Sequence, residues 1–144
     1  MPGPLFAMST PPRAARSIGP QEDAEIRRLV ARFYDAVRRD ELLGPIFEAA
    51  IHDWDSHLVT MRNFWASAVY RTGDYSGNPL AVHRRFTTLG HHHYKRWLSM
   101  WLGTVEREVA GSRREPFKRL AARMAETMSA KCIPQDGPNA ALGE

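Results

Sequence analysis

Apolar residues recur at steps of three and four along most of the chain, and this spacing constrains the fold more than any other feature. It is clearest between residues 21 and 39, where one face would carry Ile26, Leu29, Val30, Phe33 and Val37. Such spacing is typical of an amphipathic helix, and no segment shows the strict alternation of a half-buried strand. The sequence therefore predicts an all-α fold.

Proline, glycine and capping residues divide the chain into further helices. Asp53 can accept a hydrogen bond from the first turn of a helix that runs to Tyr70. Asn78 and Pro79 suit the start of a short helix, and Gly90 marks a break before a long one. The expected helices cover residues 21–39, 46–51, 54–70, 79–85, 91–109 and the segment from about 115 onward.

Length and composition indicate one soluble domain with a tail at each end. A chain of 144 residues, 43% of them hydrophobic, can bury a core of its own. We expect a disordered leader at 1–20, a domain at 21–131 and a flexible tail at 132–144. The leader lacks a secretory signal, although an acid-free start with arginines also weakly resembles a transit peptide. With no stretch of about 18 apolar residues, we expect a cytoplasmic protein and no membrane partner.

Charge and cysteine content exclude several kinds of site. The formal net charge of +4 comes from scattered cations, with 20 Lys and Arg against 16 Asp and Glu, and no recognition-helix motif stands out. We therefore expect no nucleic-acid partner. The single Cys132 excludes an internal disulfide and a cysteine-rich zinc site.

Two histidines stand apart from the other four. His57 lies on the apolar face of its expected helix, and His83 lies in a short helix after a glycine-containing loop. Burying an imidazole is costly unless its ring nitrogens find partners. A backbone carbonyl is the simpler partner for either residue taken alone, and a metal centre is the other. Together with inward-facing Phe, Tyr and Trp residues, the pair indicates a pocket for a flat, apolar, iron-containing guest.

Four segments in order then resemble one family: FYDAVRRDELLGPIF (33–47), WDSHLVTMRNFW (54–65), GDYSGNPLAVH (73–83) and HHYKRWLSMW (92–101). The series is similar to the truncated haemoglobins, or 2-on-2 globins, and most closely to their group III. The glycine-pair signature of the other groups is missing. The resemblance spans about residues 26–125. It implies a globin-like 2-on-2 helical sandwich around haem b, iron protoporphyrin IX.

Carried over residue by residue, the resemblance makes His83 the proximal iron ligand. Its other ring nitrogen should donate to a carbonyl one turn earlier, which fixes the tautomer. Tyr34, His57 and Trp97 match the distal residues that contact the bound ligand, and Met61 faces the same side. Whether His57 donates to the ligand, gates the pocket or binds iron itself stays open, as does coordination by Met61. A plain packing role also stays open for Tyr34 and Trp97.

The pocket walls and rim follow from the same resemblance. The expected haem-pocket residues are Phe33, Phe47, Phe64, Trp65, Leu80, Phe86 and Tyr94. The expected partners of the haem propionates are Thr60, Arg62, Arg84 and Arg85, although charges on a helix usually form a solvated face. His91, His92 and His93 are consecutive and point about 100° apart. They cannot converge on one ion, so we expect a solvated helix start with only His93 turned inward.

The resemblance implies a haem protein that binds the diatomic ligands O2, NO and CO. Candidate activities are NO detoxification and peroxidase-like reduction, and both need an external reductase because the sequence contains no flavin or nicotinamide domain. The alternatives are a non-catalytic oxygen store, transporter or sensor, and a cofactor-free helical interaction module. We expect a monomer or weak dimer.

Overall fold

The computed structural model describes residues 17–133, and its regular elements are all helical. The predicted all-α class is confirmed for this part of the chain. The elements are α1 (Pro20–Arg39), α2 (Gly44–Ala50), α3 (Trp54–Tyr70), α4 (Pro79–His83), α5 (His91–Glu108), the short 3-10 helix η1 (Gly111–Arg113) and α6 (Arg114–Cys132).

Local sequence signals explain where two of the helices begin. The Asp53 carboxylate accepts a hydrogen bond from the Ser56 amide at 3.1 Å, and so caps α3. The Asn78 side chain accepts one from the Ala81 amide at 3.1 Å, and so caps α4. Both caps were predicted from the sequence.

Two short helices differ from the prediction at their ends. α2 begins two residues early, at Gly44, because its hydrogen bonds already start at the Leu43 carbonyl. Gly44 is buried so close to α1 that an added Cβ would lie 2.8 Å from the Arg38 carbonyl oxygen. α4 ends at His83 instead of continuing to 85, because the amides of Arg85 and Phe86 bond to carbonyls three residues back and tighten the chain into a turn.

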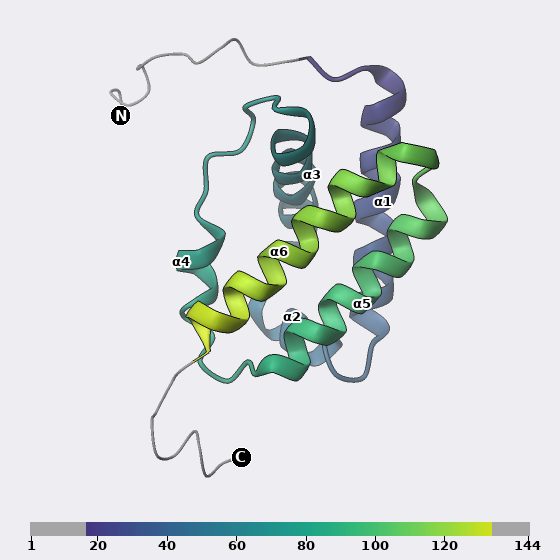
Figure 1. The fold of residues 1–144 in the computed structure, drawn as a ribbon. Helices are drawn as coiled ribbons and strands as arrows, with labels where there is room; N and C mark the ends of the chain where they lie inside the picture. Colours follow the sequence, from purple (N-terminus) through teal and green to yellow (C-terminus); the bar gives the residue numbers. More distant parts are fainter. Residues whose placement is uncertain (1–16, 134–144) are drawn as a thin grey trace, which may run out of the picture.

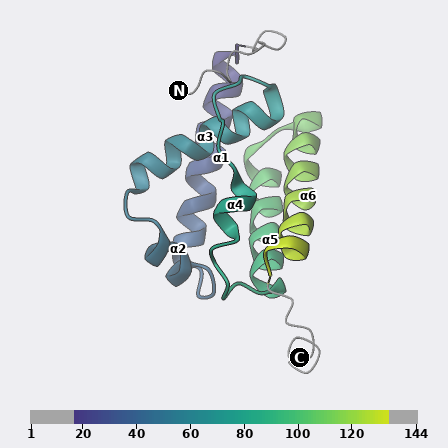
Figure 2. The same cartoon turned by 90° about the vertical axis from the view of Figure 1, so that its left-hand side faces the viewer.

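The long helices form two layers. α5 and α6 lie side by side, connected by η1, and α1 packs against both α5 and α3 (Figure 1). In the second view α4 faces the viewer, with α2 and α3 on one side of it and α5 and α6 on the other (Figure 2). The short helix α4 therefore stands at the open edge between the two layers.

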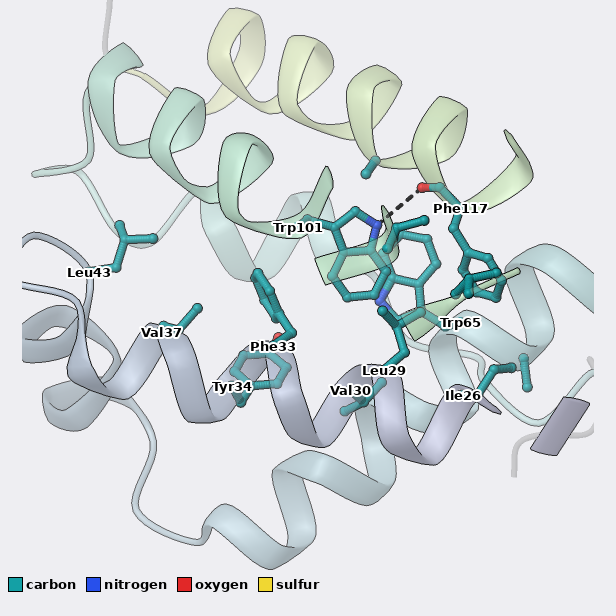
Figure 3. Close-up of a cluster of buried hydrophobic side chains, with 14 residues drawn as sticks. Ile26, Leu29, Val30, Phe33, Tyr34, Val37, Leu43, Trp65, Trp101 and Phe117 are labelled. Carbon is teal, nitrogen blue, oxygen red and sulfur yellow. Dashed lines mark hydrogen bonds between the residues drawn. The ribbon is translucent and has the colours of Figure 1, made fainter. Parts of the chain in front are cut away.

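An aromatic core holds α1, α3, α5 and α6 together (Figure 3). The rings of Trp65 and Trp101 stack with centroids 4.3 Å apart, and Phe33 meets Trp101 edge-on at 5.0 Å. The indole N–H of Trp101 donates to the Phe117 carbonyl at 3.2 Å. Trp101 can thus be fully buried without an unpaired donor.

Two ion pairs fix the ends of α1. Glu25 is 4% exposed and accepts two hydrogen bonds from Arg113, at 3.0 and 2.9 Å. This guanidinium holds the pKa of Glu25 below its usual range. At the other end Asp40 accepts from the amides of Leu42 and Leu43 and pairs with Arg96 of α5, which lowers the pKa of Asp40. The layers are therefore tied together on both sides of the core.

The helices extend slightly beyond the expected limits of the domain. Pro20 already belongs to α1, and the buried Cys132 is the last residue of α6, so the helical domain runs one residue further at each end than expected. Most of the expected leader (1–16) and tail (134–144) lies outside the described residues. None of the helices between residues 17 and 133 is long and apolar enough to span a membrane.

Candidate ligand-binding cavity

A cavity of about 430 Å³ opens between the two layers, next to α4, and all six α-helices contribute to its wall. Its volume lies within the range of small-molecule and cofactor sites, about 300–1,000 Å³. Most of the wall is apolar, and the polar groups on it are few. These are Tyr34, His57, Thr60, Tyr75, His83, Arg85, His93 and Tyr94.

His83 is held in a defined orientation on this wall. Its Nδ1 lies 2.7 Å from the Pro79 carbonyl oxygen, one turn earlier in α4. A carbonyl can only accept, so we assign the ring proton to Nδ1, which leaves a lone pair on Nε2. The carbonyl partner predicted from the sequence is thereby confirmed. An imidazole in this tautomer is suited to bind a metal through Nε2.

α4 has only five residues and depends on its neighbours for position. The Cys132 thiol at the end of α6 donates to the Leu80 carbonyl at 3.7 Å. Tyr94 of α5 lies beside His83, with ring centroids 6.4 Å apart. Burial raises the pKa of Tyr94 to about 12, and its buried hydroxyl has no partner among residues 17–133. The contacts with α5 and α6 therefore place His83 against the cavity.

His57 and Tyr34 lie on the wall formed by α1 and α3. The His57 ring packs edge-on against Tyr34 at 5.0 Å and against Trp54 at 5.6 Å. Its Nε2 is buried without a hydrogen-bond partner in the described part of the chain. Burial lowers the pKa of His57 and raises that of Tyr34. At neutral pH this wall presents a neutral imidazole and a protonated phenol.

Two parallel tryptophans of α5 have different surroundings. Trp97 and Trp101 stack at 6.3 Å with an angle of 3° between their planes. Trp101 uses its N–H inside the core, whereas Trp97 is half-buried and lies on the cavity wall. Of the two indoles, only that of Trp97 can contact a molecule in the cavity, and it can only donate.

The structure brings together most of the residues singled out in the sequence. On the wall lie Phe33, Tyr34, Phe47, His57, Thr60, Met61, Phe64, Trp65, His83, Arg85, Phe86, Tyr94 and Trp97. Arg62 and Arg84 do not line it, because each follows a wall residue and is turned about 100° away along its helix or turn. Leu80 lines a separate cavity of about 260 Å³ and packs with Tyr94, Met128 and Cys132, because α4 turns that side toward α6. The structure therefore places these three residues away from the wall of the main cavity, and their expected roles stay predictions.

Several wall residues were missed by sequence reasoning. Tyr75 reaches the cavity from the loop before α4 and packs edge-on against Phe64 at 5.1 Å. A lone aromatic residue in a polar, glycine-containing loop was its only signal. Met124 and Met128 lie on the apolar face of α6, but their spacing does not reveal that part of this face meets a cavity. The other missed residues are Leu43, Ile46, Ala50, Ile51, Pro79, Val82, Leu89 and Ala125.

The three consecutive histidines separate as expected. His91 and His92 are exposed, whereas His93 is half-buried and lines the cavity. The Nδ1 of His93 accepts a hydrogen bond from the Gly90 amide at 2.9 Å, which caps α5. Burial and the neighbouring His92 lower the pKa of His93. This histidine therefore serves the helix start as well as the cavity wall.

Comparison with known proteins points to one family. No protein-family model matches the chain. The group 3 truncated hemoglobin ctb of Campylobacter jejuni is 36% identical over 80 residues, which are 53% of this chain. That match spans 63% of the relative, so somewhat less than two thirds of its length is covered.

The fold comparison covers more of the chain. The crystal structure of a group III truncated hemoglobin from Campylobacter jejuni superimposes with a TM-score of 0.74 and 27% identity. The superposition covers 85% of this chain and 97% of that one. In sequence and in fold the chain is therefore similar to the truncated haemoglobins, most closely to group III, and the resemblance predicted from the sequence is confirmed.

Proposed function

We propose that the chain binds haem in the cavity through His83, and that a diatomic molecule such as O2, NO or CO binds on the side of Tyr34, His57 and Trp97. The hydrogen bond from His83 Nδ1 to the Pro79 carbonyl carries this proposal, because it keeps Nε2 unprotonated and available to a metal. When bound, haem would supply an iron centre able to bind a small molecule, and His83 would hold that iron.

The cavity fits such a group in shape and chemistry. Aromatic side chains including Phe47, Phe64 and Trp65 form walls suited to a flat apolar ring. Thr60 and Arg85 also line the cavity, and they are the residues we assign to the carboxylates of the ring. Their place on the cavity wall supports these two over the other two candidates, Arg62 and Arg84.

On the opposite wall, three residues would contact the diatomic molecule. The Tyr34 hydroxyl and the Trp97 N–H are donors, and neutral His57 can donate from one ring nitrogen. Donors surrounded by apolar side chains favour a ligand that carries partial negative charge. This wall therefore favours O2 over CO, and Met61 adds apolar contact without a donor.

We further propose that the protein carries out redox chemistry on the bound diatomic molecule. Strong donation slows release of a ligand and helps to polarise the bond between its two atoms. The distal wall offers more donors than simple carriage requires, which supports NO detoxification or peroxide reduction with electrons from an external donor. A non-catalytic oxygen store or sensor is the alternative.

The first test is the absorption spectrum of the ferrous, haem-loaded protein with and without CO. We expect His83→Ala to lose the spectrum of histidine-ligated haem, while the exposed His92→Ala behaves like the wild type. If His57→Ala abolished haem retention and His83→Ala did not, the two walls would have been assigned in reverse. A protein that shows no Soret band after addition of hemin would contradict haem binding altogether.

A second test separates the redox proposal from its alternative. Stopped-flow measurements give the rate of O2 release, and the consumption of NO and peroxide gives turnover. Slow release together with turnover supports redox chemistry. Fast release without turnover indicates a store or sensor.

A further inference from the structure

The chain contains no acidic residue from Tyr75 to Val105, and this stretch includes α4 and most of α5. Within it, the segment 84–96 carries Arg84, Arg85, Lys95, Arg96 and three histidines. We name residues 84–96 the basic segment. Between residues 22 and 74 and between residues 106 and 133 the chain mixes both signs of charge, so the absence of acids from Tyr75 to Val105 is local and not a consequence of the net charge.

Two cations of the basic segment are free to meet another molecule. Arg84 and Lys95 are exposed and form no ion pair within residues 17–133. Arg85 is exposed and unpaired as well, but it lines the cavity and is assigned to the haem carboxylates, so it is not counted among them. Arg96 alone is paired, with Asp40 from the end of α1. By contrast, Glu106, beyond the acid-free stretch, pairs with two cations of α6.

The basic segment lies directly beside the cavity. It begins at the residue after His83, and Arg85, Phe86, Leu89 and His93 within it form part of the cavity wall. Figure 2 shows α4 facing the viewer and the chain running from it to the start of α5 along the same side of the molecule. The part of the surface nearest to His83 is therefore positively charged.

We infer that the basic segment is the docking surface for an acidic electron-donor protein. This inference rests on the proposed haem binding. The donor protein would give up one electron and become oxidised, and ferric iron held by His83 would become ferrous, with no atom transferred. An acidic partner is attracted to unpaired cations before contact, which raises its rate of association and sets its orientation. Docking here would bring the donor close to the cofactor.

Other anionic partners fit the segment less well. A nucleic acid is bound mainly through the phosphates along its backbone, which requires cations along an extended path or a helix that enters a groove. The free cations of the basic segment, Arg84 and Lys95, instead directly follow the cavity-wall residues His83 and Tyr94 in the chain. A redox partner, by contrast, has to come close to this cavity in order to pass an electron to the cofactor.

The test measures binding of a purified, acidic, oxidised flavodoxin to the haem-loaded protein by calorimetry at low and high salt. We compare the double variant Arg84→Glu/Lys95→Glu with the control Arg107→Glu/Arg119→Glu. The control residues are also exposed, lack ion pairs within residues 17–133, and give the same change in charge. Arg107 lies sixteen residues after His91, roughly 24 Å along α5.

We expect binding at low salt that weakens as salt rises, because exposed charges are screened. Arg84→Glu/Lys95→Glu should weaken binding about tenfold and the control about twofold or less. In a separate measurement, reduction of the ferric, haem-loaded protein by reduced flavodoxin should slow in the same order, while its reduction by dithionite stays equal among the variants.

Three results would overturn the inference. The first is that flavodoxin does not bind at low salt, and the second is that both double variants weaken its binding equally. The third is that a DNA oligonucleotide binds more tightly than flavodoxin and that Arg84→Glu/Lys95→Glu abolishes this DNA binding. Haem uptake is recorded separately for every variant. If the wild type takes up no haem, the proposed function fails, whereas normal haem uptake without flavodoxin docking defeats only this inference.

Discussion

Replacing His57 by leucine should stabilise the haem-free protein. The buried Nε2 of His57 has no partner among the described residues, and an unsatisfied buried polar group costs about 1–3 kcal/mol. Leucine is close in volume but loses the edge-on contacts of the ring with Tyr34 and Trp54, worth about 0.5–1.5 kcal/mol each. These two terms are of similar size, and leucine adds about 1 kcal/mol because it buries more apolar surface than imidazole. We therefore expect a net gain of about 1 kcal/mol in the free energy of unfolding at pH 7.5, or roughly 3–4 °C in Tm.

The gain should grow as the pH falls. Burial lowers the pKa of His57 in the folded state below its usual value of 6.5. The unfolded chain therefore binds a proton more readily, and the wild type loses stability as the pH falls through 6.5 toward the folded pKa. The slope is at most about 1.4 kcal/mol per pH unit, and smaller here because the ring is only half-buried. The leucine variant lacks this loss.

Urea unfolding of the haem-free protein, followed by circular dichroism at pH 7.5 and pH 5.5, measures both effects. His52→Leu is the matched control, since His52 is exposed and should leave the wild-type pH dependence in place. In the haem-loaded protein, His57→Leu should instead speed ligand release because a donor is lost. A leucine variant that is less stable than the wild type at both pH values would show that His57 is a satisfied core residue and refute the reasoning.

Three further changes test other contacts. Trp97→Phe should speed O2 release about tenfold with little loss of stability, because it removes one N–H donor from the cavity wall; stopped-flow kinetics would show it, and an unchanged rate would leave Trp97 as packing only. Trp101→Phe should instead lower the free energy of unfolding by about 2 kcal/mol, because the buried Phe117 carbonyl loses its donor, and unaltered urea unfolding would contradict this. Glu25→Gln should cost about 1–2 kcal/mol at pH 7, below the usual cost of breaking a buried ion pair because Arg113 is 41% exposed. Since the pKa of Glu25 is lowered below 4.5, the wild type should keep this advantage above pH 4.5 and lose it as the pH falls through the folded pKa; a difference that persists at pH 3 would speak against the ion pair.

Much of the fold could be predicted because each long helix carries its own signals. The Asp53 and Asn78 caps and the apolar face of α1 depend only on neighbouring residues. The ends of α2 and α4 could not be predicted to the residue. They depend on the approach of Gly44 to α1 and on the tightened turn after His83, and both are set by tertiary contacts.

The cavity was predictable in its anchor residues and less so in its walls. His83 and its carbonyl partner lie one turn apart, so local helix geometry was enough to relate them. Tyr75 and Met128 reach the cavity from a loop and from a distant helix, and only the packing of whole elements brings them there. The position of Leu80 could not be predicted either, because the contact of α4 with α6 decides which side of this short helix meets the cavity.

The internal hydrogen bond of α4 separates two properties of its histidine. His83 and the Pro79 carbonyl belong to the same five-residue helix, so donor and acceptor move together when the helix moves. A shift of α4 within its flanking loops would change how far Nε2 reaches into the cavity, but it would leave the electron-donating strength of the imidazole unchanged. With this arrangement of α4, the distance of Nε2 from a bound metal and the strength of the imidazole as a ligand become independent adjustments. The first can be tuned by substitutions in the loops and the second by substitutions within α4.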